Sequence, residues 1–274
     1  NPRAMIPIGA HKKLQAHMGR TVVTHFLALK EEVMSFTLRH SALLIDPIVF
    51  ALTACGGGGE SDSPAVVSVS TFPLNTVVEH YIKESATYQV RIQGTASANG
   101  QVIPLSGTGT YSVSNVPSTF EGAQSIRRNG ATTGTIGGNG VSVPVADAHS
   151  EHYGLDFKPL GRVALGAYCV HANQVQPPIA AKVGDSGTWY TSTCFTSSSK
   201  LSKFGTKVVS YVLEPDSDTT AILKIIEKIT PLSGLPALST SAFRINTAGG
   251  YALLSEVASL TESGVTTSLT LTFQ

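Results

Sequence analysis

Four consecutive glycines, Gly56–Gly59, constrain what this 274-residue chain can fold into more than any other stretch. They are followed by the polar run Glu60-Ser-Asp-Ser-Pro64. Glycine and small polar residues have no apolar surface to bury, so such a run behaves as a flexible coil and not as part of a packed domain. We therefore expect the chain to divide here, with a tether over residues 55–65 and one folded domain over residues 66–274.

The residues before the glycines have the pattern of an export signal. A positively charged start, with Arg39 and His40, precedes the apolar stretch Ser41–Leu52, which has the length of a signal-peptide core. The stretch ends in Leu52-Thr53-Ala54-Cys55. This ending resembles the lipobox of bacterial lipoproteins. The resemblance implies that residues 34–54 are a signal peptide, removed after Ala54, and that Cys55 carries a diacylglycerol.

The same resemblance implies a location for the domain. Lipid on Cys55 fastens the protein to a membrane, and in such lipoproteins of Gram-negative bacteria a residue other than Asp at the next position, here Gly56, goes with sorting to the outer membrane. We expect the domain in the periplasm or at the cell surface. The alternative is that Ala42–Leu52 is a buried segment of a larger domain and Cys55 an ordinary thiol, against which the glycine run argues.

Residues 1–33 precede the signal and have a helical pattern of apolar positions. A signal peptide normally starts the chain. Either the start has been placed too early, with Met34 the first residue, or residues 1–33 form a long charged region of the signal. Both interpretations leave them outside the folded domain.

Charge excludes one class of partner. Residues 1–54 hold six Lys and Arg against three Asp and Glu, a net charge of +3, and the remainder holds thirteen against fifteen, a net charge of −2. Nucleic-acid-binding domains carry clustered basic residues that contact phosphates. A nearly neutral domain of this kind predicts no nucleic-acid partner.

Short segments of alternating apolar and polar residues predict an all-β domain. The alternation is clear in Tyr88–Gln93 and in Thr266–Phe273, and Asn99-Gly100 and Asn139-Gly140 are strong two-residue hairpin signals. We expect about ten strands in an antiparallel meander that forms a barrel, a sandwich or a strongly curved, half-closed sheet. For Thr76–Lys83, helix and strand both remain open.

Two cysteines remain in the domain if Cys55 is lipidated. Cys169 and Cys194 lie in strand-like runs, and an oxidising periplasm favours joining such an even pair. Two buried free thiols are the alternative.

Gly184-Asp185-Ser186-Gly187 is similar to the run around the nucleophile of trypsin-like serine peptidases. A nucleophilic serine needs a histidine base within hydrogen-bonding distance. Nothing in the sequence marks His149, His152 or His171 as that base. We expect an ordinary turn, in which Asp185 caps main-chain amides and glycine takes a positive φ.

The remaining motifs favour structural roles. Asp147, His149, Glu151, His152 and Asp156 gather metal-ligand types but lack the spacing of a zinc motif, so a polar loop is expected. A solvated turn is expected at Asp216-Ser217-Asp218, and no phosphate-binding loop at Thr135–Gly140. Five aromatic residues form either a ligand platform or ordinary core pairs: Tyr153, Tyr168, Trp189, Tyr190 and Tyr211.

Together with the lipobox, three segments look like those of a group of uncharacterised β-rich lipoproteins of Gram-negative proteobacteria: Phe120–Gly122, Lys182–Thr188 and Val208–Glu214. This resemblance implies no activity. We expect a membrane-anchored envelope lipoprotein with a non-catalytic binding or structural domain, no cofactor, and no identified partner besides the membrane. The alternatives are a hydrolase that uses Ser186 and a carrier of an apolar ligand.

Overall fold

The computed structural model describes residues 68–164, 166–262 and 264–274. The predicted signal peptide and the lipidation site at Cys55 lie outside the described residues. The described chain holds one helix and twelve strands. Their bounds are α2 Leu74–Lys83, β1 Ala86–Ala98, β2 Gln101–Phe120, β3 Ala123–Gly138, β4 Val141–Tyr153, β5 Pro159–Ala164, β6 Ala167–Ala172, β7 Ser186–Phe195, β8 Lys203–Pro215, β9 Thr220–Pro231, β10 Ala237–Asn246, β11 Tyr251–Glu262 and β12 Val265–Phe273.

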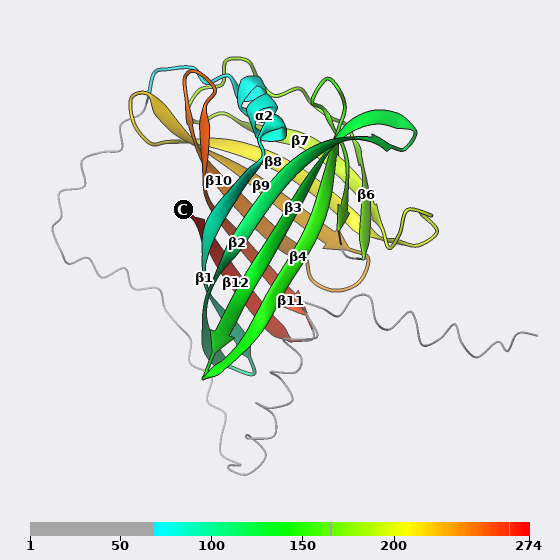
Figure 1. Cartoon of the computed structure of the whole chain (residues 1–274), viewed down its shortest axis with the longest axis vertical. Helices are drawn as coiled ribbons and strands as arrows, with labels where there is room; N and C mark the ends of the chain where they lie inside the picture. Colours follow the sequence, from blue (N-terminus) through cyan, green and yellow to red (C-terminus); the bar gives the residue numbers. More distant parts are fainter. Residues whose placement is uncertain (1–67, 165, 263) are drawn as a thin grey trace, which may run out of the picture. The chain divides into compact units, whose positions relative to one another are not determined.

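The strands form one closed antiparallel barrel (Figure 1). Each strand pairs with its neighbours in the chain, and β1 pairs with β12 to complete the circle, from Val90 opposite Phe273 to Ala98 opposite Val265. The predicted all-β meander is confirmed, and of the three architectures the barrel is the one adopted. Closure gives every strand a neighbour on both sides, although β5 is short and pairs only with the His149–Tyr153 part of β4.

The barrel has twelve strands where the sequence predicts about ten. The strand β5 was not expected, because Pro159 and Gly161 within six residues are typical of a loop. In the structure, the ring of Phe120, from the tip of the β2–β3 hairpin, occupies the space that a Cβ at position 161 would need. Glycine here permits the hairpin to pack against the outside of β5.

The Asn-Gly hairpin predictions are confirmed. Asn99 and Gly100 have φ values of 51° and 76°, and Asn139 and Gly140 have values of 51° and 81°. Positive φ at both central positions matches the right-handed twist of the flanking strands. These turns fix the register of β1 with β2 and of β3 with β4.

The helix α2 packs its apolar face onto the barrel. Leu74 and Val77 are almost fully buried in a cluster with Leu213, Leu223 and Phe243. These partners come from β8, β9 and β10. Figure 1 shows α2 at the upper end of the barrel. Of the two possibilities for Thr76–Lys83, the helix is correct, since buried side chains at helical spacing outweigh the low helix propensity of the two valines.

The two cysteines of the domain are joined. Cys169 on β6 and Cys194 on β7 are directly opposite in the register, with Cα atoms 4.0 Å apart and a Sγ–Sγ distance of 2.06 Å. This agrees with the expected disulfide. It links two of the shorter strands of the barrel.

Candidate ligand-binding site

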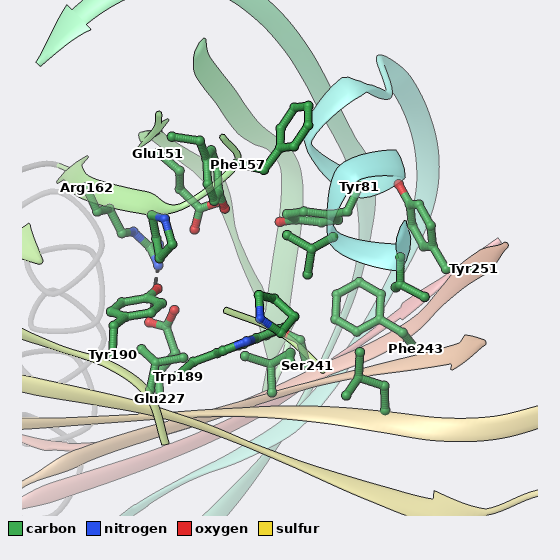
Figure 2. A pocket seen from close by; sticks show the side chains of 18 of the residues that line it. Tyr81, Glu151, Phe157, Arg162, Trp189, Tyr190, Glu227, Ser241, Phe243 and Tyr251 are labelled. Carbon is green, nitrogen blue, oxygen red and sulfur yellow. Dashed lines mark hydrogen bonds and ion pairs between the residues drawn. The ribbon is translucent and has the colours of Figure 1, made fainter. Parts of the chain in front are cut away.

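A pocket of about 140 Å³ lies inside the barrel. Its walls come from α2 and from eight strands, β2, β4, β5 and β7–β11, together with the loops around β5 and before β7. We call it the barrel pocket. Figure 2 shows its charged side chains, Glu151, Arg162 and Glu227, on one side and the rings of Tyr81 and Phe243 on the other.

Strand alternation explains how charged groups reach the interior. On β9, Leu223, Ile225 and Glu227 share the inward face, while Lys224 and Lys228 point outward. Glu227 is therefore placed among apolar side chains by the period of the strand. Sequence reasoning missed it, although an acidic residue on an otherwise apolar strand face is a usable signal.

Glu227 forms ion pairs with two buried cations. It accepts a hydrogen bond from Arg162 Nη1 at 3.3 Å and one from Lys207 Nζ at 3.2 Å. The Lys207 side chain is only 2% exposed. Burial raises the pKa of the Glu227 carboxyl, but the charges of Lys207 and Arg162 outweigh burial and hold that pKa at about 2. Burial lowers the pKa of Lys207, and the Glu227 charge acts against that lowering. The three groups therefore form a buried ion-paired network.

Glu151 is the second ionised carboxylate of the barrel pocket. It accepts a hydrogen bond from the Tyr153 hydroxyl at 2.7 Å, and Arg162 lies directly opposite it in the β4–β5 register. Burial would raise the pKa of Glu151, yet the Arg162 charge leads a net lowering. Both glutamates thus remain charged beside one guanidinium.

Aromatic rings form the wall beneath α2. Tyr81 makes edge contacts with Phe243 at 5.7 Å and with Tyr251 at 6.0 Å between ring centroids. Arg128 lies 4.0 Å over the Tyr81 ring and donates from Nη1 to the Glu84 carbonyl at 3.1 Å. Burial raises the pKa of Tyr81 to about 12, so its hydroxyl stays protonated. Arg128 thereby connects the end of the helix to the interior.

Three polar groups of the barrel pocket stand out within the described residues. One is His149 Nδ1, which is buried without a hydrogen-bond partner and lies 3.5 Å from Asp147 Oδ2. The Trp189 Nε1 donor is buried without a hydrogen-bond acceptor. The Glu256 carboxyl faces the pocket and its side chain is half-buried. Burial raises the pKa of Glu256, with Arg162 acting in the opposite direction. Buried polar groups are normally satisfied, so Trp189 Nε1 and His149 Nδ1 are available to a bound molecule, as is the pocket-facing carboxyl of Glu256.

A third polar cluster is closed. His171 Nδ1 and Ser192 Oγ are 2.8 Å apart, and the imidazole stacks on Tyr190 with centroids 4.3 Å apart. Burial, followed by the charge of Lys207, lowers the pKa of His171 to about 2. The ring is therefore neutral, and Ser192 and His171 satisfy each other beneath the pocket wall.

Ser186 directly follows the predicted turn, as the first residue of β7. The Lys182 amide donates to Asp185 Oδ2 at 2.8 Å, and Gly184 has a φ of 95°. The serine is exposed at the start of β7, and none of the described histidines hydrogen-bonds to it. The structure does not bring His149, His152 or His171 to this serine.

The metal-ligand types near position 150 are separated by the strand. His149 and Glu151 face the barrel pocket, whereas His152 packs on Phe120 with centroids 4.6 Å apart. The segment is strand β4 and not the polar loop expected from the sequence, because the alternation continues to Tyr153. Across the described ranges, no three such side chains form a metal-binding group.

The structure has turns at two other positions where the sequence predicts them. Asp216 accepts hydrogen bonds from Arg244 Nε at 2.9 Å and Nη2 at 3.1 Å, between β8 and β9. Bonding to Arg244 lowers the pKa of Asp216. Asn139-Gly140, at the end of the glycine-rich run, is a hairpin turn.

The five aromatic residues divide between the two interpretations. Tyr153, Trp189 and Tyr190 line the barrel pocket. Tyr168 stacks on Phe120 with centroids 5.3 Å apart, and Tyr211 contacts Trp189 at 5.7 Å. Three of the five are thus placed to contact a ligand.

No protein-family model, curated protein or solved structure matches this chain. Over the part of the chain that the structure describes, no helix has the length and apolar character needed to cross a membrane. The barrel pocket must therefore be understood from its own residues.

Proposed function

We propose that the domain is a binding protein that holds a small organic molecule inside its barrel. The observation that supports this most is the barrel pocket itself, a partly open space of about 140 Å³ lined by aromatic and charged side chains. Ligand sites are typically concave and mostly apolar, with a few polar groups that fix orientation. Here Trp189 Nε1 and Glu256 are those groups.

The lining favours a ligand with both polar and apolar parts. The sequence alternative was a carrier whose cavity is lined by Leu, Ile and Val. Leu223, Ile225 and Val209 do line the barrel pocket, but Arg162 and Glu227 line it too. Arg162 and Glu227 satisfy each other, but a purely hydrocarbon ligand would leave the Trp189 Nε1 donor without a partner, which is unfavourable in a buried site.

The binding proposal can be tested with the only tryptophan of the chain, Trp189, as the reporter. Small organic fragments are expected to change its fluorescence, and a ligand at 100 times its Kd should stabilise the protein by about 2.7 kcal/mol. Ser241→Phe fills the pocket and should weaken binding tenfold or more. Thr240→Phe, on the opposite face of β10, is the matched control.

Thermal unfolding of both variants shows whether each is folded. A folded Ser241→Phe protein that binds fragments as tightly as the unchanged chain would place the ligand elsewhere. A broad fragment library without any stabilising molecule would contradict the binding function.

We further propose that this domain is anchored to the outer membrane through lipid on Cys55. The Leu52–Cys55 lipobox and the Gly56–Gly59 tether support the anchor. The Cys169–Cys194 disulfide supports an oxidising compartment, since disulfides are rare in the cytosol.

Metabolic labelling tests the anchor. Cells that produce the full chain with an alkyne-tagged fatty acid should label the protein, and Cys55→Ser should abolish the label and release the protein from the membrane fraction. Ser61→Ala, in the same tether, should keep both label and location. Equal labelling of the Cys55→Ser variant would show that the lipid is attached elsewhere or that no lipobox is used.

A further inference from the structure

The charges of the barrel pocket do not balance. Its carboxylates are Glu151, Glu227 and Glu256, and the cations that contact or oppose them are Arg162 and Lys207. Arg162 and Lys207 both bond to Glu227, and Arg162 also lies opposite Glu151. The third carboxyl, Glu256, makes no ion pair among the described residues. Arg162 acts on it from a distance, as does His149, another pocket residue, whose Nδ1 lies 3.5 Å from Asp147 Oδ2.

A third buried cation, Arg128, does not fill this place. It is 3% exposed, lies over the Tyr81 ring, and donates to the Glu84 carbonyl oxygen. Arg128 is therefore committed to the end of α2. None of the hydrogen bonds of Arg128 reaches Glu256, whose carboxyl faces the space inside the barrel pocket.

A β-bulge directs Glu256 into this space. The register of β10 with β11 passes from Phe243 opposite Leu253 to Ala242 opposite Ser255, which leaves Leu254 without a partner. The extra residue reverses the alternation beyond it. Tyr251 and Leu253 point inward before the bulge, and Glu256 points inward after it, opposite Ser241.

The surroundings of Glu256 suit a cation. Its side chain is deep in the barrel but keeps exposed surface toward the pocket, where burial raises its pKa. Tyr81, Tyr111, Trp189 and Tyr251 line the same space. Aromatic faces attract cations, most strongly where water is excluded. An ammonium group would both neutralise the carboxylate and contact these rings.

The volume indicates the size of the group that fits inside the pocket. At about 140 Å³ the barrel pocket is similar to the engineered cavity of about 150 Å³ that accommodates benzene. One aromatic ring with a short side chain is therefore the appropriate scale. The aromatic wall beneath α2 offers the apolar surface for the ring.

We propose that the barrel pocket selects small organic amines, with the ammonium group paired to Glu256 and an apolar or aromatic body against Tyr81, Phe243 and Tyr251. This inference rests on the proposed binding function. It adds the chemical class of the ligand and the residue that recognises it.

Three probes of matched shape test the proposal on the full chain: 2-phenylethylamine, 2-phenylethanol and phenylacetate. Their binding is followed by Trp189 fluorescence and by calorimetry. The amine is expected to bind about tenfold or more tightly than the alcohol, and the carboxylate most weakly. Glu256→Gln, which keeps the shape, should lower amine affinity tenfold or more and leave the alcohol within about twofold. Glu79→Gln, on the exposed face of α2, should change neither affinity.

The outcomes separate the two proposals. If the alcohol or the carboxylate binds as tightly as the amine, or if Glu256→Gln leaves amine affinity unchanged, the preference for amines is wrong and the binding function stands. If none of the three probes binds, and a broad fragment library also yields no ligand, the binding function fails with it. Unfolding curves of Glu256→Gln confirm that the variant is folded, and the retained alcohol affinity confirms that its pocket is intact.

Discussion

Replacing Glu227 with glutamine is expected to lower the free energy of unfolding by about 3–5 kcal/mol, because the change leaves Arg162 and Lys207 buried without their shared carboxylate. Breaking a buried ion pair from one side is among the most destabilising single changes. Urea denaturation of the full chain measures the difference. The size of the effect follows from the near-complete burial of Lys207.

Two further variants test the cause. Glu227→Gln combined with Lys207→Met removes both charges and should recover part of the lost stability. Glu214→Gln breaks the half-exposed pair with Lys224, at 2.7 Å, and should cost less than about 1 kcal/mol. A loss for Glu227→Gln no larger than the loss for Glu214→Gln would contradict the buried network.

The lowered pKa of Glu227 predicts that the stability of the protein falls in acid. The folded-state pKa of Glu227 is about 2, below the value of about 4.3 in an unfolded chain. A lowered pKa contributes stability that is present above the unfolded value and is lost as the pH falls toward 2. The contribution at neutral pH is about 3 kcal/mol. Glu227→Gln should therefore show a flatter fall in stability between about pH 4 and pH 2.

Removing the disulfide is expected to have the second largest effect. The double variant Cys169→Ala/Cys194→Ala should lose about 3–4 kcal/mol of unfolding free energy, because the cross-link limits the conformations of the unfolded chain. Urea denaturation with and without a reducing agent measures this loss.

Reduction supplies the control. The unchanged chain should lose a similar amount of stability when reduced, and the double variant should be insensitive to the reducing agent. An unchanged unfolding midpoint after complete reduction would mean that the link between β6 and β7 constrains nothing of consequence.

The hairpins were predictable from sequence, whereas the closure of the barrel was not. Asn99-Gly100 and Asn139-Gly140 specify their turns locally, because few other residues accept positive φ. The pairing of β1 with β12 joins segments from the two ends of the domain, and no local pattern records it. Barrel, sandwich and half-closed sheet share the same local alternation, so only the structure separates them.

The barrel pocket was only partly predictable. Trp189 and Tyr190 stand out in the sequence, but their role depends on which strands face them. Glu227 carries a signal, since it interrupts an apolar strand face. For Glu256, the sequence pattern indicates the wrong face of the strand. Simple alternation from Tyr251 and Leu253 would place Ser255 inside and Glu256 outside, and only the bulge at Leu254 reverses this.

The seam between β1 and β12 has a consequence for the order of folding. Val90, near the start of the domain, finds its partner Phe273 only after every other strand has been made. Contacts so distant in sequence form slowly, because a long chain must be ordered before they are gained. During synthesis one edge of β1 therefore stays unpaired until β12, the last strand, has been made.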